Sequence, residues 1–380
     1  MLVNPLSLTD FTLDGEYGSQ GAVLEQVGIN HFRLTLGTAP NHPTWTNRPQ
    51  FILDRNAKGN RLKLDVISPV PGGGHYPMNE YNYSWSYDNE HWHPIRWEGS
   101  SPETNTFLFP EFTEDVVYFG HQVPFSPEHL ERLADGWRDD PRVTVHELGR
   151  SLGGRPVYRF EITDPGSKIA RNDRGGHYVV NTHPGEHNAQ WRIIGMMHWL
   201  LNDPQAVPFL ERTICHFVVM MCPDGPSHGW YRVNEQGVDL NRSYSLPAAD
   251  EGNQAHESYI CQRDLERLIA AGSRMATVWS MHTWEGAVEP ILNPGPESDA
   301  PPRHWSVLRE LMQRNDPHGY VRPLHIAEEP LGKADGWNGG PQRQFGGAGV
   351  LCEGGGALLT KEENLASGEV IMRSLADFYR

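Results

Sequence analysis

The sequence predicts an α/β protein in which a mixed, largely parallel sheet is flanked by helices and is preceded by an antiparallel β-sandwich. Up to about residue 120, short segments of alternating apolar and polar residues are separated by Gly, Pro and Asn, as in a sandwich. Beyond about residue 125, strand-like apolar runs alternate with helical segments, which is typical of a sheet covered by helices. We therefore expect a sandwich domain over residues 1–124 and an α/β domain over residues 125–380.

The N-terminal segment contains five short stretches with the two-residue period of strands, and residues 70–82 form a long irregular connection. The segment is rich in Trp and Tyr, which could form a face that binds carbohydrate or peptide, or could fill the core and rim of a small sandwich. The predicted strands cover residues 31–37, 50–55, 61–68, 82–88 and 107–112. The aromatic residues are Trp45, Tyr81, Tyr83, Trp85, Tyr87, Trp92 and Trp97.

The C-terminal segment alternates between strand and helix patterns. Residues 213–222 are almost continuously apolar, as expected of a strand that is covered on both faces. The predicted strands are 157–163, 176–182, 213–222, 275–281 and 347–354. The predicted helices are 188–203, 258–272, 303–315 and 365–380.

The composition excludes several classes of function. A net charge of −16 without a basic stripe argues against a nucleic-acid partner, because nothing would neutralise the phosphates. No apolar run reaches the ~18 residues that cross a membrane, and the first residues lack the pattern of a secretory signal. We therefore expect a cytoplasmic protein with buried, reduced thiols. The four cysteines are Cys215, Cys222, Cys261 and Cys352.

The stretch NTHPGEHNAQW places His183, Glu186 and His187 within five positions. One interpretation is the helical zinc signature His-x-x-Glu-His, in which both histidines bind the metal. However, Pro184 and Gly185 follow an apolar strand directly, and this pair favours a turn over a continuous helix. We therefore expect His183 at the end of a strand, Glu186 at the start of the next helix, and His187 as a neighbour that is not a ligand.

A third ligand should then come from another strand end. His282 follows the strand-like segment 275–281 and lies 96 residues after Glu186. In an open α/β sheet the carboxyl ends of the strands face one crevice, so the three side chains could meet there. Two histidines and a glutamate with a fourth position open to water form the ligand set of a catalytic zinc. Each histidine alone is weak support, because the chain contains 19.

Five motifs occur in order along the chain and together form a specific signal. They are HPGE at 183–186, PDGxxxGWYR at 223–232, GVDLNR at 237–242, SMHTW at 280–284 and LCEGG at 351–355. With these motifs the chain resembles the zinc carboxypeptidases, and in particular the cytosolic carboxypeptidase branch, in which a β-sandwich precedes the peptidase domain. The resemblance extends from about residue 115 onward and is diffuse before that. It implies that residues 125–380 form a catalytic domain with a zinc carboxypeptidase-like fold.

The resemblance also implies roles for the residues of the centre. One Zn²⁺ per chain would be bound by His183, Glu186 and His282. Glu353 matches the general base, and Asp239 would orient His183 through its other ring nitrogen. Without the other motifs, Glu353 would be interpreted as a solvated carboxylate at a strand end. For Asp239, a structural salt bridge is the alternative.

The remaining roles concern anionic groups. Arg232 matches the arginine that stabilises the developing oxyanion, although it could also be a surface arginine near a glycine loop. Asn241 and Arg242 match the pair that grips the terminal carboxylate of the substrate, for which a planar guanidinium is suited.

The sequence departs from the family pattern in one place. The best-known members have a mobile tyrosine a little over twenty residues before the catalytic glutamate, whereas no Tyr occurs between Val321 and Glu353. Residues 332–347 fill this region, and their glycines predict a flexible loop. Lys333, Trp337 and Arg343 are its candidate pocket residues.

The function that the resemblance implies is hydrolysis of the C-terminal peptide bond of peptides or proteins. The resemblance suggests a preference for acidic residues, whereas the net charge of −16 weighs against a polyacidic substrate. A local basic pocket could override this, and the candidates are Arg303, Arg322, Lys333 and Arg343. The alternatives are a zinc amidohydrolase that removes an acyl group from an amino acid, and a catalytically silent binding protein.

Overall fold

The fold was analysed on a computed structural model that describes residues 4–75, 77–252, 254–284, 288–295 and 302–380. The chain forms two compact units. The N-terminal unit contains the residues up to 127 together with 225–237 and 359–361, and the C-terminal unit contains 128–224, 238–358 and 362–380. The two units are thus not contiguous along the sequence, unlike the expected division into 1–124 and 125–380.

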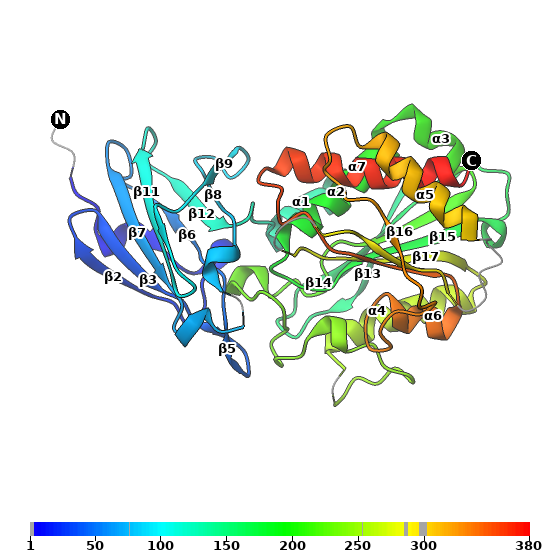
Figure 1. The fold of residues 1–380 in the computed structure, drawn as a ribbon, viewed down its shortest axis with the longest axis horizontal. Coiled ribbons are helices and arrows are strands. Elements are labelled where there is room, and N and C mark those ends of the chain that lie inside the picture. The colour runs from blue at the N-terminus through cyan, green and yellow to red at the C-terminus, as the bar shows by residue number, and fades with distance from the viewer. Residues whose placement is uncertain (1–3, 76, 253, 285–287, 296–301) are drawn as a thin grey trace. The chain divides into compact units, whose positions relative to one another are not determined.

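The N-terminal unit contains two five-stranded sheets and a small β-ribbon (Figure 1). Every pair in the two sheets is antiparallel except β3/β7, which is parallel. The first sheet runs β1 (Phe11–Thr12), β6 (Gln50–Leu53), β12 (Val117–His121), β8 (Tyr83–Ser86), β9 (Trp92–Ile95). The second runs β10 (Gly99–Ser100), β11 (Thr104–Glu111), β7 (Arg61–Ile67), β3 (His31–Thr35), β2 (Val23–Gly28), and the ribbon pairs β4 (Thr38–Ala39) with β5 (His42–Thr46). The five strands predicted here are present as β3, β6, β7, β8 and β11, whereas β1, β2, β4, β5, β9, β10 and β12 were not predicted.

The core of this unit lies between its two sheets. Along β7 the side chains alternate, so Leu62, Leu64 and Val66 are buried, as the two-residue period requires. The rings of Phe107, from one sheet, and Phe119, from the other, lie 5.4 Å apart between their centroids. Tyr81, Tyr83 and Trp85 belong to this core, so these aromatics fill the sandwich and do not form a binding face.

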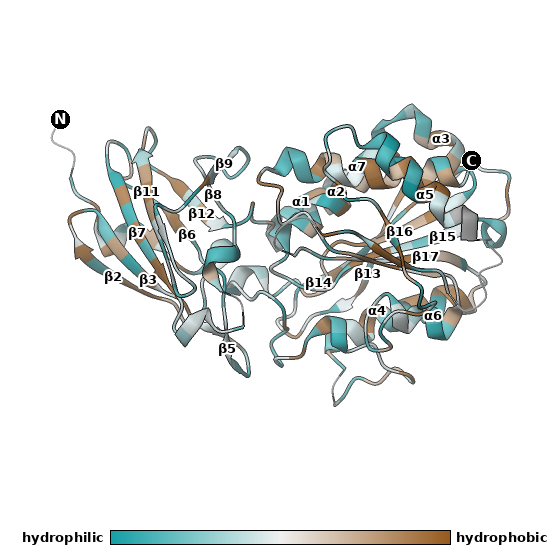
Figure 2. Cartoon of the chain, viewed as in Figure 1, coloured by the Kyte–Doolittle hydropathy of each residue, from teal (hydrophilic) through white to brown (hydrophobic). Residues whose placement is uncertain are grey.

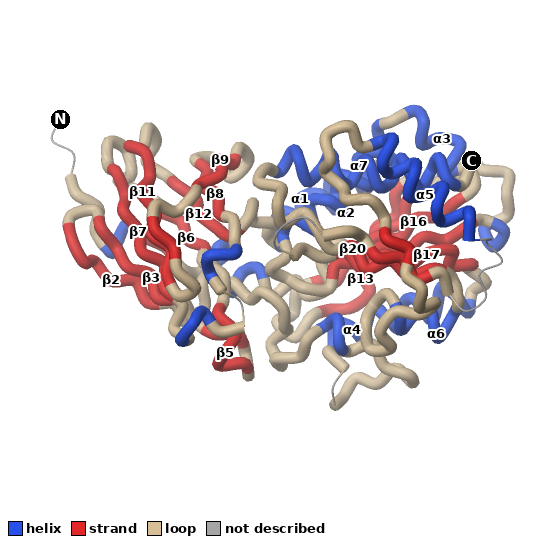
Figure 3. The backbone as a smooth tube through the Cα atoms, viewed as in Figure 1, coloured by secondary structure: helices blue, strands red, loops and turns tan. Residues whose placement is uncertain are grey.

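The C-terminal unit is built on one eight-stranded mixed sheet (Figure 3). Its central strands β16, β15, β17 and β20 are mutually parallel, whereas β13/β14, β14/β16 and β18/β20 are antiparallel. All six residues of β16 are buried, as predicted from their continuous apolar pattern. The order is β13 (Val143–Arg150), β14 (Pro156–Ile162), β16 (Thr213–Val218), β15 (Gly175–Asn181), β17 (Arg274–Met281), β20 (Ala348–Cys352), β18 (Ile291–Asn293), β19 (His325–Ile326).

Helices cover both faces of this sheet (Figure 1). Apolar and polar residues alternate along these helices (Figure 2), as in helices that bury one face. One face carries α1 (Pro127–Trp137), α2 (His187–Asn202), α3 (Val207–Leu210), α5 (Pro302–Asn315) and α7 (Lys361–Phe378). The other carries α4 (His256–Ala270) and α6 (Gly339–Phe345). The four predicted helices correspond to α2, α4, α5 and α7. Short 3₁₀ turns occupy Leu8–Asp10, Gly15–Tyr17, Pro71–Gly73, Met78–Glu80, Arg171–Asp173, Pro204–Ala206, Pro226–His228 and Leu240–Arg242.

The described residues bear on two further expectations, one about membrane-spanning helices and one about the cysteines. Among them, no helix is both long enough and apolar enough to cross a bilayer. All four cysteines are buried and free, as predicted.

Helices α2 and α7 pack backbone against backbone through two glycines. A Cβ atom built on Gly368 would stand well inside contact distance of the carbonyl oxygen of Arg192. A Cβ built on Gly195 would meet the carbonyl oxygen of Leu365 in the same way. Because both obstacles are backbone atoms, no side-chain rotation can relieve them, and the helices would have to separate.

We expect Gly368→Ala to lower the free energy of unfolding by roughly 1–3 kcal/mol, the usual cost of overpacking a filled interior. The measurement is urea unfolding followed by tryptophan fluorescence. Gly136→Ala is the control, since Gly136 lies in α1 and a Cβ there would meet nothing within 4 Å. That change should stabilise the protein by roughly 0.5–1 kcal/mol. Equal stability of the two variants would contradict this account of the α2–α7 contact.

Candidate metal centre

His183 and Glu186 lie where a central strand gives way to a helix. Strand β15 ends at Asn181, residues 184 and 185 form the turn predicted from Pro-Gly, and Glu186 is the N-cap residue of α2. His187 is the first residue of α2, and its Nδ1 lies 3.2 Å from Gln190 Oε1. Burial lowers the pKa of His187 to about 4, so its ring is neutral at neutral pH. The chain therefore turns between His183 and His187, as the strand-end interpretation requires.

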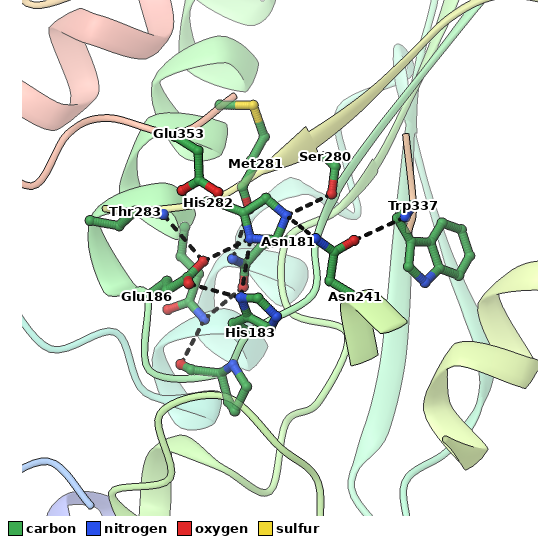
Figure 4. Close-up of polar contacts among 12 residues, drawn as sticks. Asn181, His183, Glu186, Asn241, Ser280, Met281, His282, Thr283, Trp337 and Glu353 are labelled. Atoms are coloured by element: carbon green, nitrogen blue, oxygen red, sulfur yellow. Dashed lines mark hydrogen bonds and ion pairs between the residues drawn. The ribbon is translucent and has the colours of Figure 1, made fainter. Parts of the chain in front are cut away.

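His282 lies beside these two residues, although it is far from them in sequence. It follows β17, which pairs in parallel with β15, so both strand ends open on the same edge of the sheet. The Nδ1 atoms of His183 and His282 are 3.1 Å apart. The carboxylate of Glu186 bridges them, with Oε1 at 2.8 Å from His183 Nδ1 and Oε2 at 3.0 Å from His282 Nδ1 (Figure 4).

This cluster has the properties of a metal site. One ligand atom from each of the three residues lies within 4.8 Å of the others, the one such cluster found among the described residues. All three side chains are at most 3% exposed. Burial alone would raise the pKa of Glu186, but His183 and His282 outweigh it and lower the pKa to about 2. Two imidazole nitrogens and a carboxylate that converge in this way form the donor set that Zn²⁺ takes in catalytic sites.

A second ring of polar groups fixes the two imidazoles. Asp239 Oδ1 lies 3.1 Å from His183 Nε2, and Asp239 is itself held at the start of a 3₁₀ turn, where it accepts a hydrogen bond from the N–H of Asn241. Ser280 Oγ lies 2.8 Å from His282 Nε2. Such contacts orient a histidine so that its other nitrogen faces the metal. The sequence interpretation missed Ser280, although it lies on β17 two positions before His282, a spacing that puts side chains on the same side of an extended chain.

Glu353 lies on the next strand end. Strand β20 pairs in parallel with β17, Met281 is opposite Cys352, and the N–H of His282 donates to the carbonyl of Cys352 at 2.9 Å. Glu353 follows directly and stands beside His282 (Figure 4). Its side chain is half-buried and lines a cavity of about 30 Å³, which is room for about one water molecule.

Asn241 lies against the cluster, and Arg242 stands next to it in the same 3₁₀ turn. Asn241 Oδ1 accepts the N–H of Trp337 at 2.9 Å, and this contact turns Nδ2 toward His282 Nε2, 3.1 Å away. Arg242 is exposed, and its Nη1 donates to the carbonyl of Asn241 at 2.7 Å.

Arg232 belongs to segment 225–237, which folds with the N-terminal unit. The neighbouring residue, Tyr231, helps to enclose the buried guanidinium of Arg48, which lies 4.3 Å from the Tyr231 ring and 3.6 Å from the Tyr81 ring. The N–H of Arg48 also donates to the carbonyl of Gly229 at 2.8 Å. His183, Glu186, His282, Asp239, Asn241, Arg242 and Glu353 thus belong to one compact unit, and Arg232 belongs to the other.

The expectation for residues 332–347 was wrong in part. Residues Gly339–Phe345 form α6, and Trp337 is fully buried in the core of the C-terminal unit, where its Nε1 donates to Ser258 Oγ at 3.0 Å. Trp337 is therefore a core residue and not a pocket residue. Lys333 and Arg343 are exposed, and Arg343 donates to the carbonyl of Gly339 at 3.0 Å. The glycines predicted a loop because glycine has a low helix propensity. Tertiary contacts nevertheless stabilise a helix in this segment.

The fold and the centre together define a class of protein: an α/β metalloprotein whose His–Glu–His cluster lies at the carboxyl ends of parallel strands, with a further carboxylate beside it. Residues 131–277 match the zinc carboxypeptidase family (Peptidase_M14). This part of the chain thus matches a zinc carboxypeptidase domain, and the resemblance stated from the sequence is confirmed. Zinc is the metal of this family, and the cluster is suited to bind it.

Two curated relatives and one solved structure are similar to this chain. Cytosolic carboxypeptidase 2 of Xenopus tropicalis is 34% identical over 154 residues, which are 39% of this chain and 16% of the relative. Cytosolic carboxypeptidase 3 of Mus musculus is 30% identical over 207 residues, 52% of this chain and 19% of the relative. The chain therefore covers less than a fifth of the length of these two relatives. The crystal structure of a metallo-carboxypeptidase from Burkholderia cenocepacia superposes with a TM-score of 0.76 at 20% identity, over 97% of this chain and 99% of that one, and so shares the fold.

We expect the purified protein to contain about one zinc ion per chain, and His183→Ala or His282→Ala to lose it, because each removes one of three ligands. Metal analysis after gel filtration measures this. His187→Ala is the matched control and should retain zinc. Loss of zinc in His187→Ala, with full occupancy in His183→Ala, would instead support the helical signature.

Proposed function

We propose that this protein is a zinc-dependent carboxypeptidase that hydrolyses the C-terminal peptide bond of peptides or proteins. The observation that carries the proposal is the meeting of His183, Glu186 and His282 at one edge of the sheet, with Glu353 on the adjacent strand end. The family match and the curated relatives support a carboxypeptidase function for this domain. A silent binding protein would have no need for a buried ligand set beside a half-exposed carboxylate.

The proposed chemistry divides the work among the residues. When zinc is bound by His183, Glu186 and His282, its contribution is to polarise the scissile carbonyl and to acidify the attacking water. Glu353 takes a proton from that water and passes it to the nitrogen of the leaving amine as the bond breaks. Its half-buried position beside His282 suits this role, because the carboxylate can reach both water and substrate.

Recognition of the chain end is assigned to Asn241 and Arg242. The exposed guanidinium of Arg242 can donate two parallel hydrogen bonds to a terminal carboxylate, and Asn241 can add a third from its amide. Arg232 is assigned to the oxyanion that develops on the scissile carbonyl. Support for these three assignments comes from the motifs PDGxxxGWYR and GVDLNR.

Preference for an acidic residue at the chain end is a finer proposal. Of the four basic candidates, Arg322 is exposed and lines the same cavity as Glu353, which makes it the strongest. Side chains at residues 302–304 are not described, so Arg303 lies outside this comparison. Tyr320, the last tyrosine before Glu353, lines that cavity as well and is the candidate to supply the phenol that the sequence lacks further on.

The location and the partners of the enzyme are proposed on similar grounds. The relatives are named cytosolic carboxypeptidases, which supports a cytoplasmic location. Peptides or proteins are the partners that the family implies. The absence of nucleic acid and membrane among its partners remains a prediction from the composition.

Glu353→Gln should keep the fold and zinc but lose roughly 10²–10⁴-fold in turnover, because the amide cannot accept the proton. Kinetics on a peptide substrate, together with zinc analysis of the same preparation, measure this. Near-normal turnover in the variant would remove Glu353 from the mechanism.

A peptide with a free C-terminus should be cleaved, whereas its C-terminal amide should be nearly inert. In the complex, where the bound substrate covers Arg242, an amide leaves the guanidinium without its charged partner, which costs about 2–5 kcal/mol. At about 1.4 kcal/mol per decade, this corresponds to roughly 30- to several-thousand-fold in kcat/KM. Arg242→Ala should erase the preference by slowing the free acid.

Arg232→Ala is the control in this experiment, because the oxyanion forms whatever ends the chain, so both substrates should slow together. If the wild-type protein cleaves acid and amide equally, the carboxypeptidase assignment fails. Hydrolysis of acylated amino acids in the same assay would then identify the zinc amidohydrolase.

A further inference from the structure

Arg192 is a buried arginine on α2, six residues after Glu186, and it is only 1% exposed. Its Nη1 lies 3.3 Å from the carbonyl oxygens of His282 and Glu353 and 3.4 Å from that of Gly354. Its Nη2 donates to Cys352 Sγ at 3.1 Å. One guanidinium therefore touches the ends of two neighbouring strands, β17 and β20.

These acceptors are unusual for a buried arginine because they are all neutral. In the part of the chain that the structure describes, no carboxylate forms an ion pair with Arg192. A buried cation is costly, so it needs compensation from every hydrogen bond it can make. The planar fork of arginine offers five donors in fixed directions, which suits several carbonyls at once in a way that the single ammonium of lysine does not.

The neighbours of Arg192 leave its side chain little freedom. Nε donates to Ser367 Oγ on α7 at 3.2 Å, and the backbone of Arg192 lies against Gly368. A Cβ on Gly355 would stand 3.1 Å from Arg192 Cδ, and the φ of +73° at that residue favours glycine. The cavity that Arg192 shares with Glu353 has a volume of only about 30 Å³.

We propose that Arg192 is a positioning residue that fixes the distance between the third metal ligand, His282, and the general base, Glu353. Helix α2 carries both Glu186 and Arg192, so one rigid element supplies a ligand and also holds the two strand ends that present the others. This proposal rests on the proposed function for the role of Glu353, but its claim about His282 concerns metal binding alone.

The test compares Arg192→Lys with Arg174→Lys. Arg174 is a matched control, because it is also a buried arginine that donates to backbone carbonyls, those of Ile169, Asp164 and Ser167, at the opposite end of β15. Three readouts are needed: the zinc dissociation constant from competition with a chelator, kcat and KM on a peptide, and the unfolding temperature of the metal-free protein.

Arg192→Lys should raise the zinc dissociation constant at least tenfold, in the range typical for the loss of groups that support metal ligands. It should also lower kcat at least tenfold with KM within about twofold, because none of the substrate contacts proposed above is assigned to this side chain. Arg174→Lys should lower the unfolding temperature of the metal-free protein by about as much as Arg192→Lys does. Its zinc dissociation constant and kcat should stay unchanged.

Equal zinc affinity and kcat in Arg192→Lys and the wild type would overturn the proposal, as would equal losses in the two lysine variants. If Arg192→Lys does not fold, Ser367→Ala replaces it. This change releases Nε of Arg192 and a 3.5 Å contact of Ser367 Oγ with the carbonyl of Tyr320, leaves the Nη contacts in place, and should raise the zinc dissociation constant a few-fold. An unchanged constant in Ser367→Ala then overturns the proposal. If the wild-type protein binds zinc but cleaves no peptide, the proposed function is wrong. The zinc dissociation constants of the wild type and the variants still test the role of Arg192 in that case.

Discussion

The centre of this protein depends on the parallel pairing of β15, β17 and β20. Asn181 pairs with Met281, and Met281 pairs with Cys352, so the last residues of the three strands form one row across the sheet. The side chains that follow this row are the ones that carry the proposed chemistry. A shift of one residue in any of these pairs would turn a ligand or the base to the other face. The hydrogen-bonded register of the sheet is therefore what sets the distances within the centre.

Several buried polar groups hold that edge in place. Asn181 Nδ2 donates to the carbonyl of Met281 at 3.1 Å, which ties β15 to β17 beyond their regular pairing. The N–H of Thr283 donates to Glu186 Oε2 at 3.2 Å, which ties the segment after β17 to the start of α2. Because these contacts are buried, breaking any of them leaves a polar group without compensation. These contacts thus hold together the edge at which the three candidate ligands meet.

The N-terminal unit includes a segment from the middle of the chain, residues 225–237. Segment 225–237 leaves the C-terminal unit after β16 and packs with the N-terminal sheets, where the amide of Gln50 donates to the carbonyl of Pro226 and Trp230 Nε1 donates to Gln20 Oε1 at 2.7 Å. Arg232 lies in this segment. A segment that lies between β16 and β17 in the sequence thus folds with the N-terminal sheets.

The sequence alone determined the features that depend on local chemistry. The apolar continuity of 213–222 predicted a buried strand, and Pro184–Gly185 predicted the turn that separates His183 from His187. These signals lie within a few residues, where sterics and periodicity decide the outcome. The motifs then indicated the family and its candidate residues.

Only the tertiary structure decided which residues meet. The contacts of Arg192 with two strand ends and of segment 225–237 with the sandwich join parts of the chain through strand order and helix packing, which no short pattern encodes. Trp337 shows the same limit, because its glycine-rich surroundings predicted a loop while long-range contacts bury it in the core. Local propensity costs less than about 1 kcal/mol per residue for glycine, so a well-packed tertiary environment overrides it.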